Sequence, residues 1–393
     1  MGININGTSV DKVVFNGTEV EKVIYNGTVV YTSSILEWNK VSVPTEKELN
    51  GVTYGDGKFV AVGASGTILR SNDCDSWEKS TEKTQSNLYS VAFGEVIKSE
   101  TKEVTTDSRG YALIDLIEAG IYGDKVTSIS VTGDSSATTN IFYNEEDGRE
   151  YLEINSSLTS KSINVVISFK INIFVAVGAS GTALYSESYG YDWKYGWSGS
   201  NGTSTSYDLL DVAYGNGMFV AVGKSGTVLY SKDGITWTDV TGSETNFDFE
   251  SIICANGRFF ITSASTIRYI VSTGTSKFTF SDKTDLKVTA ISITHALGKL
   301  IAIGNGTATI STNMGASWSY YSISVDSFIY SMAYGNGMFV GVGTSGQSYC
   351  SKDGGTTFEK VETNNEKPLR DITYACDKFV AVGSSGTLLV ANH

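Results

Sequence analysis

The sequence predicts an all-β chain, and its composition is the first reason. The 393 residues contain 42 glycines but only two prolines, together with 22 tyrosines and 17 phenylalanines. Aromatic residues favour strands, and glycines between short apolar runs favour the turns that join strands. Charged residues make up only 18% of the chain, below the usual quarter, so the polar surface comes largely from Ser, Thr and Asn.

A segment of about 40 residues recurs along the chain and predicts the architecture. In its clearest copy, four strand-like runs at 209–214, 218–222, 227–231 and 237–240 are separated by glycine turns. The residue equivalent to Gly223 recurs at intervals of 39 to 45 residues, except for one interval of 115, at Gly63, Gly178, Gly223, Ser263, Gly304, Gly343 and Gly383. Four antiparallel strands repeated seven times predict a seven-bladed β-propeller, because a closed ring leaves no exposed sheet edge.

The spacing of the tryptophans predicts how the ring closes. An aromatic residue follows the repeated glycine by 14 or 15 residues in five copies, at Trp77, Trp193, Trp237, Trp318 and Phe358. The last copy would need one near position 397, whereas Trp38 lies 25 residues before Gly63, the spacing that separates Trp318 from Gly343. We therefore predict that segment 38–43 is the outer strand of the last blade, and that the propeller comprises residues 34–94 and 172–393.

Two further modules are predicted outside the propeller. Residues 95–171 interrupt the second copy between its first and second strands, and their alternating apolar runs predict an inserted β-sandwich-like domain with a short helix near Ala112–Ala119. Residues 1–33 repeat Asn-Gly-Thr every ten positions, from Asn6, Asn16 and Asn26, which predicts a module of β-hairpins. The same N-x-T triplets are potential glycosylation acceptors, but no signal peptide pattern precedes them, which favours the turns.

The turn before each tryptophan carries a recognisable pattern. It reads S-x-D-x-G-x-x-W or a degraded form, as in Ser71–Trp77, Ser231–Trp237, Ser311–Trp318 and Ser351–Phe358. This pattern resembles the Asp-box of sialidases, photosystem assembly factors and related propellers, and through the repeat the resemblance covers about 350 residues. It implies structural roles for Asp73, Asp233 and Asp353, whose carboxylates would bind their own turns, and for Trp77, Trp237 and Trp318, which would pack between blades.

The N-terminal hairpins look like the leading segments of structural proteins from tailed bacteriophages and phage-like particles. The inserted stretches 105–114 and 165–170 also resemble small β-domains of such proteins. This resemblance implies a virion protein, assembled in the host cytoplasm in several copies or as a homo-oligomer: a tail fibre, baseplate or receptor-binding component. Residues 1–33 would attach it to other virion proteins, and the remainder would contact a glycan or protein of the host. A capsid decoration or head-fibre protein is the structural alternative.

Several classes of function are disfavoured by the composition. A formal charge of −13 argues against binding to nucleic acid or to an anionic membrane surface, and no apolar run is long enough to span a bilayer. Two histidines and four scattered cysteines give no metal-site pattern, so we expect no metal and no cofactor. Sialidases grip a carboxylate with three arginines, and the six arginines here do not occupy equivalent positions in the repeat. We therefore expect no catalytic residues, with a glycan-acting hydrolase as the alternative.

One aromatic stretch is the candidate ligand site. Five aromatic residues alternate along it: Tyr189, Tyr191, Trp193, Tyr195 and Trp197. On a strand, alternate side chains share one face, and aromatic faces stack on sugar rings. Packing against the inserted domain and docking of a neighbouring virion subunit are the other interpretations.

Overall fold

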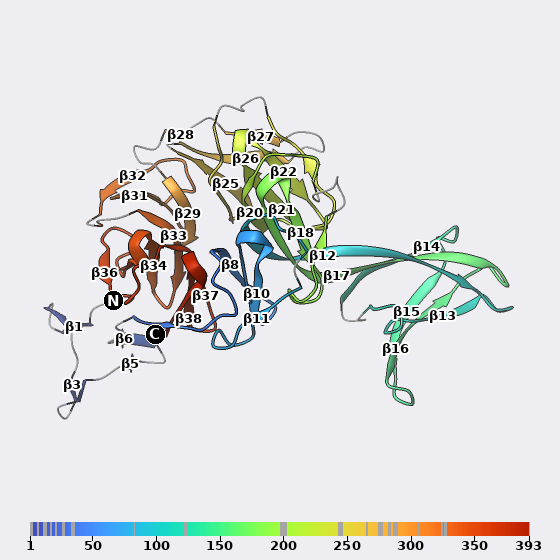
Figure 1. Ribbon diagram of the computed structural model, residues 1–393. Coiled ribbons are helices and arrows are strands. Elements are labelled where there is room, and N and C mark those ends of the chain that lie inside the picture. Colours follow the sequence, from blue (N-terminus) through green and yellow to red (C-terminus); the bar gives the residue numbers. More distant parts are fainter. Residues whose placement is uncertain are drawn as a thin grey trace. The chain divides into compact units, whose positions relative to one another are not determined.

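The protein is almost entirely β-structure, as the sequence predicts. The computed structural model describes residues 36–81, 83–121, 125–196, 203–242, 247–264, 266–273, 278–281, 284–285, 290–304, 306–323, 325 and 328–392, and six short strands before residue 33 (Figure 1). No helix in this described part is long and apolar enough to cross a membrane. None of the four cysteines is disulfide-bonded.

Seven sheets with the same strand order follow one another along the chain. The first sheet consists of β8 (Leu49–Gly55), β9 (Lys58–Gly63), β10 (Ile68–Ser71) and β11 (Glu78–Lys79). The second consists of β12 (Leu88–Thr105), β17 (Ser162–Gly178), β18 (Ala183–Ser186) and β19 (Lys194–Tyr195). The third consists of β20 (Leu209–Gly215), β21 (Met218–Gly223), β22 (Val228–Ser231) and β23 (Thr238–Asp239). The fourth consists of β24 (Ser251–Ala255), β25 (Arg258–Ser263), β26 (Thr266–Thr273) and β27 (Phe278–Phe280), with β28 (Thr284–Asp285) also paired to β26.

The last three sheets keep this order. The fifth consists of β29 (Ala290–Ala296), β30 (Lys299–Gly304), β31 (Thr307–Ser311) and β32 (Ser319–Ser322). The sixth consists of β33 (Ile329–Gly335), β34 (Met338–Gly343), β35 (Ser348–Ser351) and β36 (Glu359–Val361). The seventh joins β37 (Leu369–Ala375), β38 (Lys378–Gly383) and β39 (Thr387–Asn392) to β7 (Glu37–Lys40), which comes from the start of the described chain.

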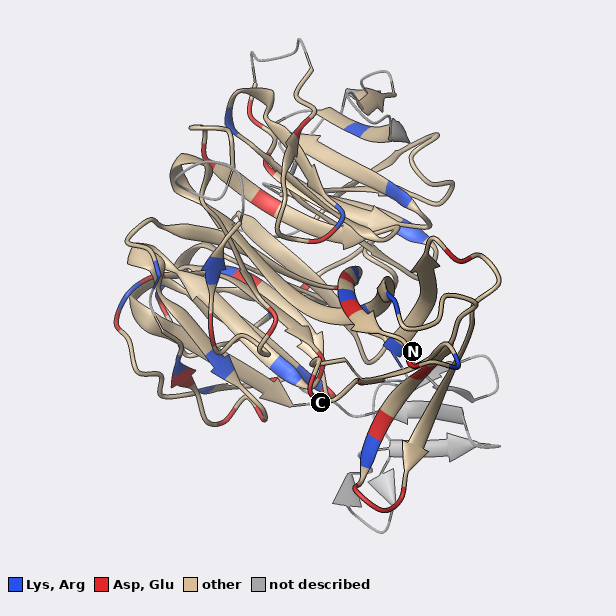
Figure 2. Ribbon diagram, turned by 90° about the vertical axis from the view of Figure 1, so that its right-hand side faces the viewer, with Lys and Arg blue, Asp and Glu red and all other residues tan. Residues whose placement is uncertain are grey.

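The burial of each strand follows from its place in the sheet. Second strands such as Lys58–Gly63 are buried at nearly every residue, because neighbouring sheets cover both faces. First strands such as Leu209–Gly215 bury fewer residues, and fourth strands such as Glu78–Lys79 are largely exposed. Positions of Lys, Arg, Asp and Glu are scattered along the ribbon, and most of the ribbon carries neither sign (Figure 2).

The seventh sheet contains strands from both ends of the sequence. Strand β7 pairs antiparallel with β39, with Trp38 opposite Ala391 and Lys40 opposite Leu389. This is the pairing that the tryptophan spacing predicts, although the strand ends at Lys40 rather than at residue 43. One further backbone bond, from Val41 N to Leu388 O at 2.9 Å, continues the ladder.

First strands of successive sheets are neighbours in cyclic order. Five such contacts join the first strands of sheets three to seven and then β37 to β8 of the first sheet. Two side-chain bonds complete the circuit: Asn50 Nδ2 donates to Leu88 O at 2.8 Å, and Ser90 Oγ donates to Asp211 Oδ1 at 2.7 Å. These contacts and bonds link the seven first strands in cyclic order.

The chain divides into two compact units, one formed by residues 1–93 and 174–393 and the other by residues 94–173. The smaller unit has two sheets. One contains the outer parts of β12 and β17 with β14 (Val126–Thr132), and the other has the order β13 (Tyr111–Asp115), β16 (Arg149–Asn155), β15 (Thr138–Asn144). Residues of both sheets, among them Ile114, Leu152 and Val165, share one apolar core.

The short helix predicted near Ala112–Ala119 is wrong. Residues 111–115 form strand β13, and a turn follows. Ala112 and Ile114 are buried whereas Leu113 is 43% exposed, so burial alternates with the period of two that belongs to a strand. The apolar content of the segment is compatible with a helix, but the alternating burial is that of a strand.

The first 35 residues contribute three two-stranded antiparallel sheets. They pair β1 (Ile3–Ile5) with β2 (Thr8–Val10), β3 (Val14–Phe15) with β4 (Thr18–Glu19), and β5 (Lys22–Tyr25) with β6 (Thr28–Thr32). Each of the three Asn-Gly pairs of this segment falls between the two strands of one sheet. These three pairs themselves lie outside the described residues.

Candidate functional site

The seven first strands line a cavity of about 570 Å³. One position of each first strand recurs through the repeat, twelve residues before the repeated glycine in six of the seven copies. We call this set the axial ring, and all of its members except Gly51 line the cavity: Gly51, Ser90, Asp211, Ser251, Ser292, Ser331 and Asp371. Five of its seven members are serines or glycine with small side chains, and two are carboxylates.

Asp211 connects three successive first strands. Its Oδ1 accepts from Ser90 Oγ at 2.7 Å and from Val212 N at 2.8 Å, while its Oδ2 accepts from Ser251 Oγ at 3.0 Å and from Ile252 N at 2.8 Å. Burial raises the pKa of this carboxyl, and the four donated bonds oppose that increase. The side chain therefore fastens the first strands of the second, third and fourth sheets together.

Asp371 does the same on the other side of the ring. Its Oδ1 accepts from Ser331 Oγ at 2.6 Å and from Ile372 N at 2.9 Å, and its Oδ2 accepts from Val52 N at 2.8 Å. Burial raises the pKa of Asp371 to about 6, with the charge of Asp211 contributing. This aspartate fastens the sixth and seventh sheets to the first.

A charged cluster lies at one end of the cavity. Arg370 Nε is 2.8 Å from Glu48 Oε1, and the guanidinium lies 5.1 Å from the ring centroid of Tyr330. Ser384 Oγ also donates to Glu48 Oε1, at 3.0 Å. Arg370 is the only arginine or lysine that lines the cavity among the described residues. Its charge is thus already balanced by a carboxylate of the first sheet.

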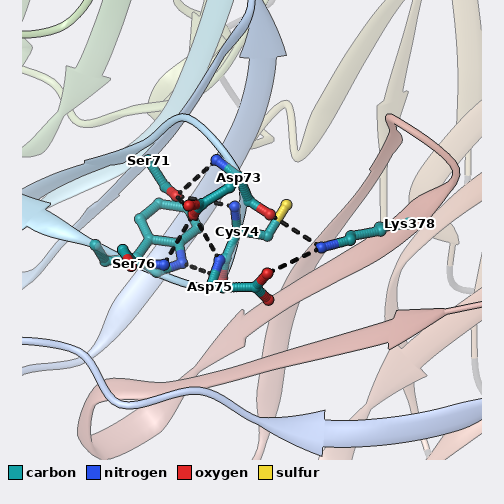
Figure 3. A network of polar contacts seen from close by, with 7 residues as sticks. Ser71, Asp73, Cys74, Asp75, Ser76 and Lys378 are labelled. Carbon is teal, nitrogen blue, oxygen red and sulfur yellow. Dashed lines mark hydrogen bonds and ion pairs between the residues drawn. The ribbon is translucent and has the colours of Figure 1, made fainter.

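The aspartates of the predicted turn motif bind their own turns. Asp73 Oδ1 accepts from the N–H groups of Asp75 and Ser76, both at 2.9 Å, and these bonds lower the pKa of the carboxyl (Figure 3). Asp233 and Asp353 accept two backbone bonds each in the same way. Lys378 of the seventh sheet reaches this first turn, donating to Asp73 O at 3.0 Å (Figure 3).

The aromatic residues of the motif pack against the preceding sheet. Trp77 shares an apolar cluster with Val380 and Val382 of the seventh sheet, and Trp38 shares one with Val340 of the sixth. Trp318 packs against the cluster of the fourth and fifth sheets, and Trp237 is 5% exposed. The indole of Trp77 also donates to Cys74 O at 2.8 Å.

Replacing Asp73 by alanine is expected to lower the urea midpoint of unfolding more than the control below does, because the variant loses a side chain that caps two backbone N–H groups. Urea unfolding followed by tryptophan fluorescence measures the change. Asp192→Ala is the matched control, because Asp192 is exposed in the equivalent turn of the second sheet, where Ser188 Oγ accepts the backbone bond instead. Equal losses in the two variants would contradict the assignment.

The aromatic stretch does not form the predicted single face. Only Lys194–Tyr195 is a strand, and the residues before Trp193 form a turn in which Tyr189 has a φ of 54°. Trp193 is fully buried, whereas Tyr189 and Tyr191 are 53% and 52% exposed. The alternation is broken because the turn rotates Trp193 into the core. Trp197 lies outside the described residues.

Three tyrosines of this segment are nevertheless exposed. Tyr195, in the short strand that follows the turn, is 39% exposed. The guanidinium of Arg70, from the first sheet, lies 4.5 Å from the ring centroid of Tyr191. We call Tyr189, Tyr191 and Tyr195 the tyrosine patch.

The axial ring was not predicted from the sequence. The sequence nevertheless contains a pattern that could have revealed it. When the copies are aligned on the repeated glycine, Asp211, Ser251, Ser331 and Asp371 fall in one column. Each residue by itself resembles an ordinary polar position of an exposed strand. In the described part of the chain, no three His, Cys, Asp or Glu side chains gather as a metal site.

Comparison with known proteins shows the fold class. No family model and no curated protein sequence matches the chain. Among solved structures, YCF48 bound to a D1 peptide is 14% identical with a TM-score of 0.58, covering 92% of this chain and 96% of that one. Virginiamycin B lyase from Staphylococcus aureus is 9% identical with a TM-score of 0.59, covering 91% and 99%. The WD40 propeller domain of Doa1 is 12% identical with a TM-score of 0.56, covering 91% and 97%.

These similarities identify the fold as a β-propeller. Identities of 9–14% are too low to carry activity or binding partners from those proteins to this one.

Proposed function

We propose that the seven sheets are the blades of one closed ring. Two observations support this: first strands are neighbours in cyclic order, and β7 supplies the fourth strand of the last sheet. We assign the turns around Asp73, Asp233 and Asp353 to the Asp-box type, because their carboxylates cap backbone N–H groups as that motif requires. Residues 94–173 are the inserted domain of the second blade.

In function, we propose a non-enzymatic structural protein of a tailed phage or phage-tail-like particle, as a tail-fibre, baseplate or receptor-binding component. The non-enzymatic role is supported by the bonds that the charged groups lining the cavity form. Asp211, Asp371 and Arg370 form bonds that hold the sheets together. Groups committed in this way are poorly placed to transfer protons or to grip a substrate.

Attachment to the particle is assigned to residues 1–33. Each of their three small sheets pairs within itself, and two-stranded sheets are marginal when isolated in water. Such hairpins gain stability by packing on other proteins of the particle. The similar structure of YCF48 with a D1 peptide gives an example of a propeller of this fold that binds a protein segment.

Labelling the protein in intact particles tests the role. Label at the tail tip or baseplate supports the proposal, label on the head moves the protein to capsid decoration, and absence from particles refutes both. Deleting residues 1–33 is expected to abolish incorporation while the propeller still unfolds cooperatively. Normal incorporation of the deleted chain would show that attachment lies elsewhere.

Host contact is assigned to the tyrosine patch, because exposed tyrosines are frequent anchors of protein and glycan interfaces. Replacing Tyr189, Tyr191 and Tyr195 together by alanine is expected to weaken binding of purified protein to host cells at least tenfold. Tyr207→Ala is the control, since Tyr207 is 52% exposed and lies outside the patch. Unchanged binding of the triple variant would contradict this assignment.

A glycan-acting hydrolase is the second candidate. One observation favours it: Asp371 has a pKa raised to about 6 and borders a cavity. Turnover assays on sialosides and cell-wall polysaccharides decide between the two functions. Hydrolysis by the native protein that disappears in Asp371→Asn would replace the structural role with an enzymatic one.

A further inference from the structure

One sheet edge of the smaller unit is open to a further strand. In the sheet of order β13, β16, β15, strand β15 (Thr138–Asn144) pairs with β16 only. From Thr138 to Tyr143, its other edge forms no hydrogen bond with the rest of the described chain. An unpaired edge presents a row of N–H and C=O groups to any strand that approaches, so proteins usually block such edges with charges, bulges or short strands.

The other edges of this unit are blocked in these ways. Strand β12 has five charged residues between Glu95 and Glu103. Strand β14 is uncharged, but its register with β17 shifts between Val126 and Ser128, as at a β-bulge. Strand β13 has five residues and ends in the charged Asp115. Strand β15 has seven residues, none of them charged, and keeps a regular register with β16 over its whole length, so it is the edge most open to pairing.

The core-facing side of β15 is incompletely covered. Thr139 and Ile141 lie opposite Ile154 and Leu152 of β16, which are both fully buried, and directly opposite residues share a face of the sheet. Strand alternation places Tyr143 on this same face, yet Tyr143 is 61% exposed, and Thr139 is exposed as well. A strand added beside β15 would continue the core face and cover both residues.

The strand is complementary to a second copy of itself. A formal charge of −13 opposes the approach of two copies at most surfaces, whereas β15 brings no charges together. An antiparallel pairing centred on Ile141 uses all seven residues of both strands. It places Thr139 opposite Tyr143 and Asn140 opposite Phe142 of the other copy, so that each aromatic side chain meets a smaller polar one on the same face.

We propose that the protein forms a symmetric dimer through β15, with the two strands antiparallel and Ile141 of each copy at the twofold axis. The same strand then contributes to both sides of the interface, as twofold symmetry requires. Two sheets of three strands become one sheet of six, joined by about six to eight backbone hydrogen bonds between the copies. This inference goes beyond the proposed particle role and does not depend on it.

Sedimentation equilibrium of the full chain at micromolar concentrations tests the dimer. The expected mass is that of two chains, falling toward one chain on dilution, and the mass of a single chain throughout overturns the proposal. Deleting residues 1–33 is expected to leave the dimer unchanged, because β15 belongs to the other unit. Loss of the dimer on this deletion would place the interface in the hairpins and would also overturn the proposal.

A charge on the core-facing side of the edge tests the interface. Thr139→Lys is expected to weaken association at least tenfold, because pairing would move the ammonium out of water and against Tyr143 of the other copy. Circular dichroism checks that the variant folds. Ser130→Lys is the matched control, since Ser130 is exposed on β14 of the same unit. Both variants reduce the net negative charge equally, so equal weakening by the two, or weakening by neither, overturns the proposal.

Mixing two variants tests the register. Tyr143→Glu is also expected to weaken association at least tenfold. A mixture of Tyr143→Glu and Thr139→Lys should associate more tightly than either variant alone, because pairing centred on Ile141 places the two opposite charges directly across from each other. No gain on mixing overturns this pairing. If Tyr143→Glu fails to fold, the contrast between Thr139→Lys and Ser130→Lys still decides. Particle labelling is independent of these results, so failure here and failure of the proposed function are distinguishable.

Discussion

Replacing Trp38 by alanine is expected to lower the free energy of unfolding by about 3–5 kcal/mol, the usual cost of truncating a buried aromatic side chain. Trp38 is 7% exposed and packs in one cluster with Val340 and Leu389, of the sixth and seventh sheets. Its loss leaves a cavity between two sheets and weakens the strand that pairs with β39. Urea unfolding followed by circular dichroism measures the effect.

The control for this variant is Asn39→Ala, because Asn39 is the next residue of the same strand and is exposed. It is expected to change stability by less than about 0.5 kcal/mol. A Trp38→Ala effect as small as the control would show that Glu37–Lys40 does not stabilise the seventh sheet. Deleting residues 1–43 should then also be harmless, whereas the structure predicts aggregation through the unpaired edge of β39.

The second large effect is a pH dependence that arises from Asp371. Its folded-state pKa of about 6 lies above the usual value for aspartate, so the folded protein binds this proton more tightly than the unfolded chain does. The contribution of Asp371 to stability is therefore fully present below about pH 4 and is lost as the pH rises through 6. The expected loss is about 2–3 kcal/mol. Burial raises the pKa of Asp211 as well, which adds a change of the same sign.

The aspartates of the turns make stability depend on pH in the opposite direction. Backbone hydrogen bonds lower the pKa of Asp73, so its contribution is present above about pH 4 and is lost as the pH falls further. Stability is accordingly expected to be greatest at about pH 4–5. Unfolding free energies at pH 4, 5.5 and 7 test this, with Asp371→Asn reducing the fall between pH 4 and 7 and the exposed control Asn39→Ala leaving it unchanged. The same fall in Asp371→Asn and in the native protein would contradict the assignment.

Much of the fold could be predicted because its signals are local and repeated. The glycine turns, the apolar second strands and the tryptophan spacing predict an all-β chain and a β-propeller, and both are confirmed. The pairing of Trp38 with Ala391 follows from the same spacing. Within the unit formed by residues 94–173, the helix predicted near Ala112–Ala119 is wrong, because apolar content by itself does not distinguish a helix from a strand.

The candidate sites depend on contacts that sequence spacing does not reveal. Asp371 accepts from the backbone N–H of Val52, 319 residues away in the chain, and this bond joins the seventh sheet to the first. The aromatic stretch suggested one face, but a turn at Tyr189 buries Trp193 and exposes the tyrosines around it.

The sequence by itself determined the repeat, the strands and the turns, because hydrophobic periodicity and turn chemistry act between residues close together in the chain. Only the tertiary structure decided which polar groups of neighbouring sheets meet. The packing of first strands side by side brings equivalent residues of several repeats to one cavity, and many of their hydrogen-bond partners then come from neighbouring sheets.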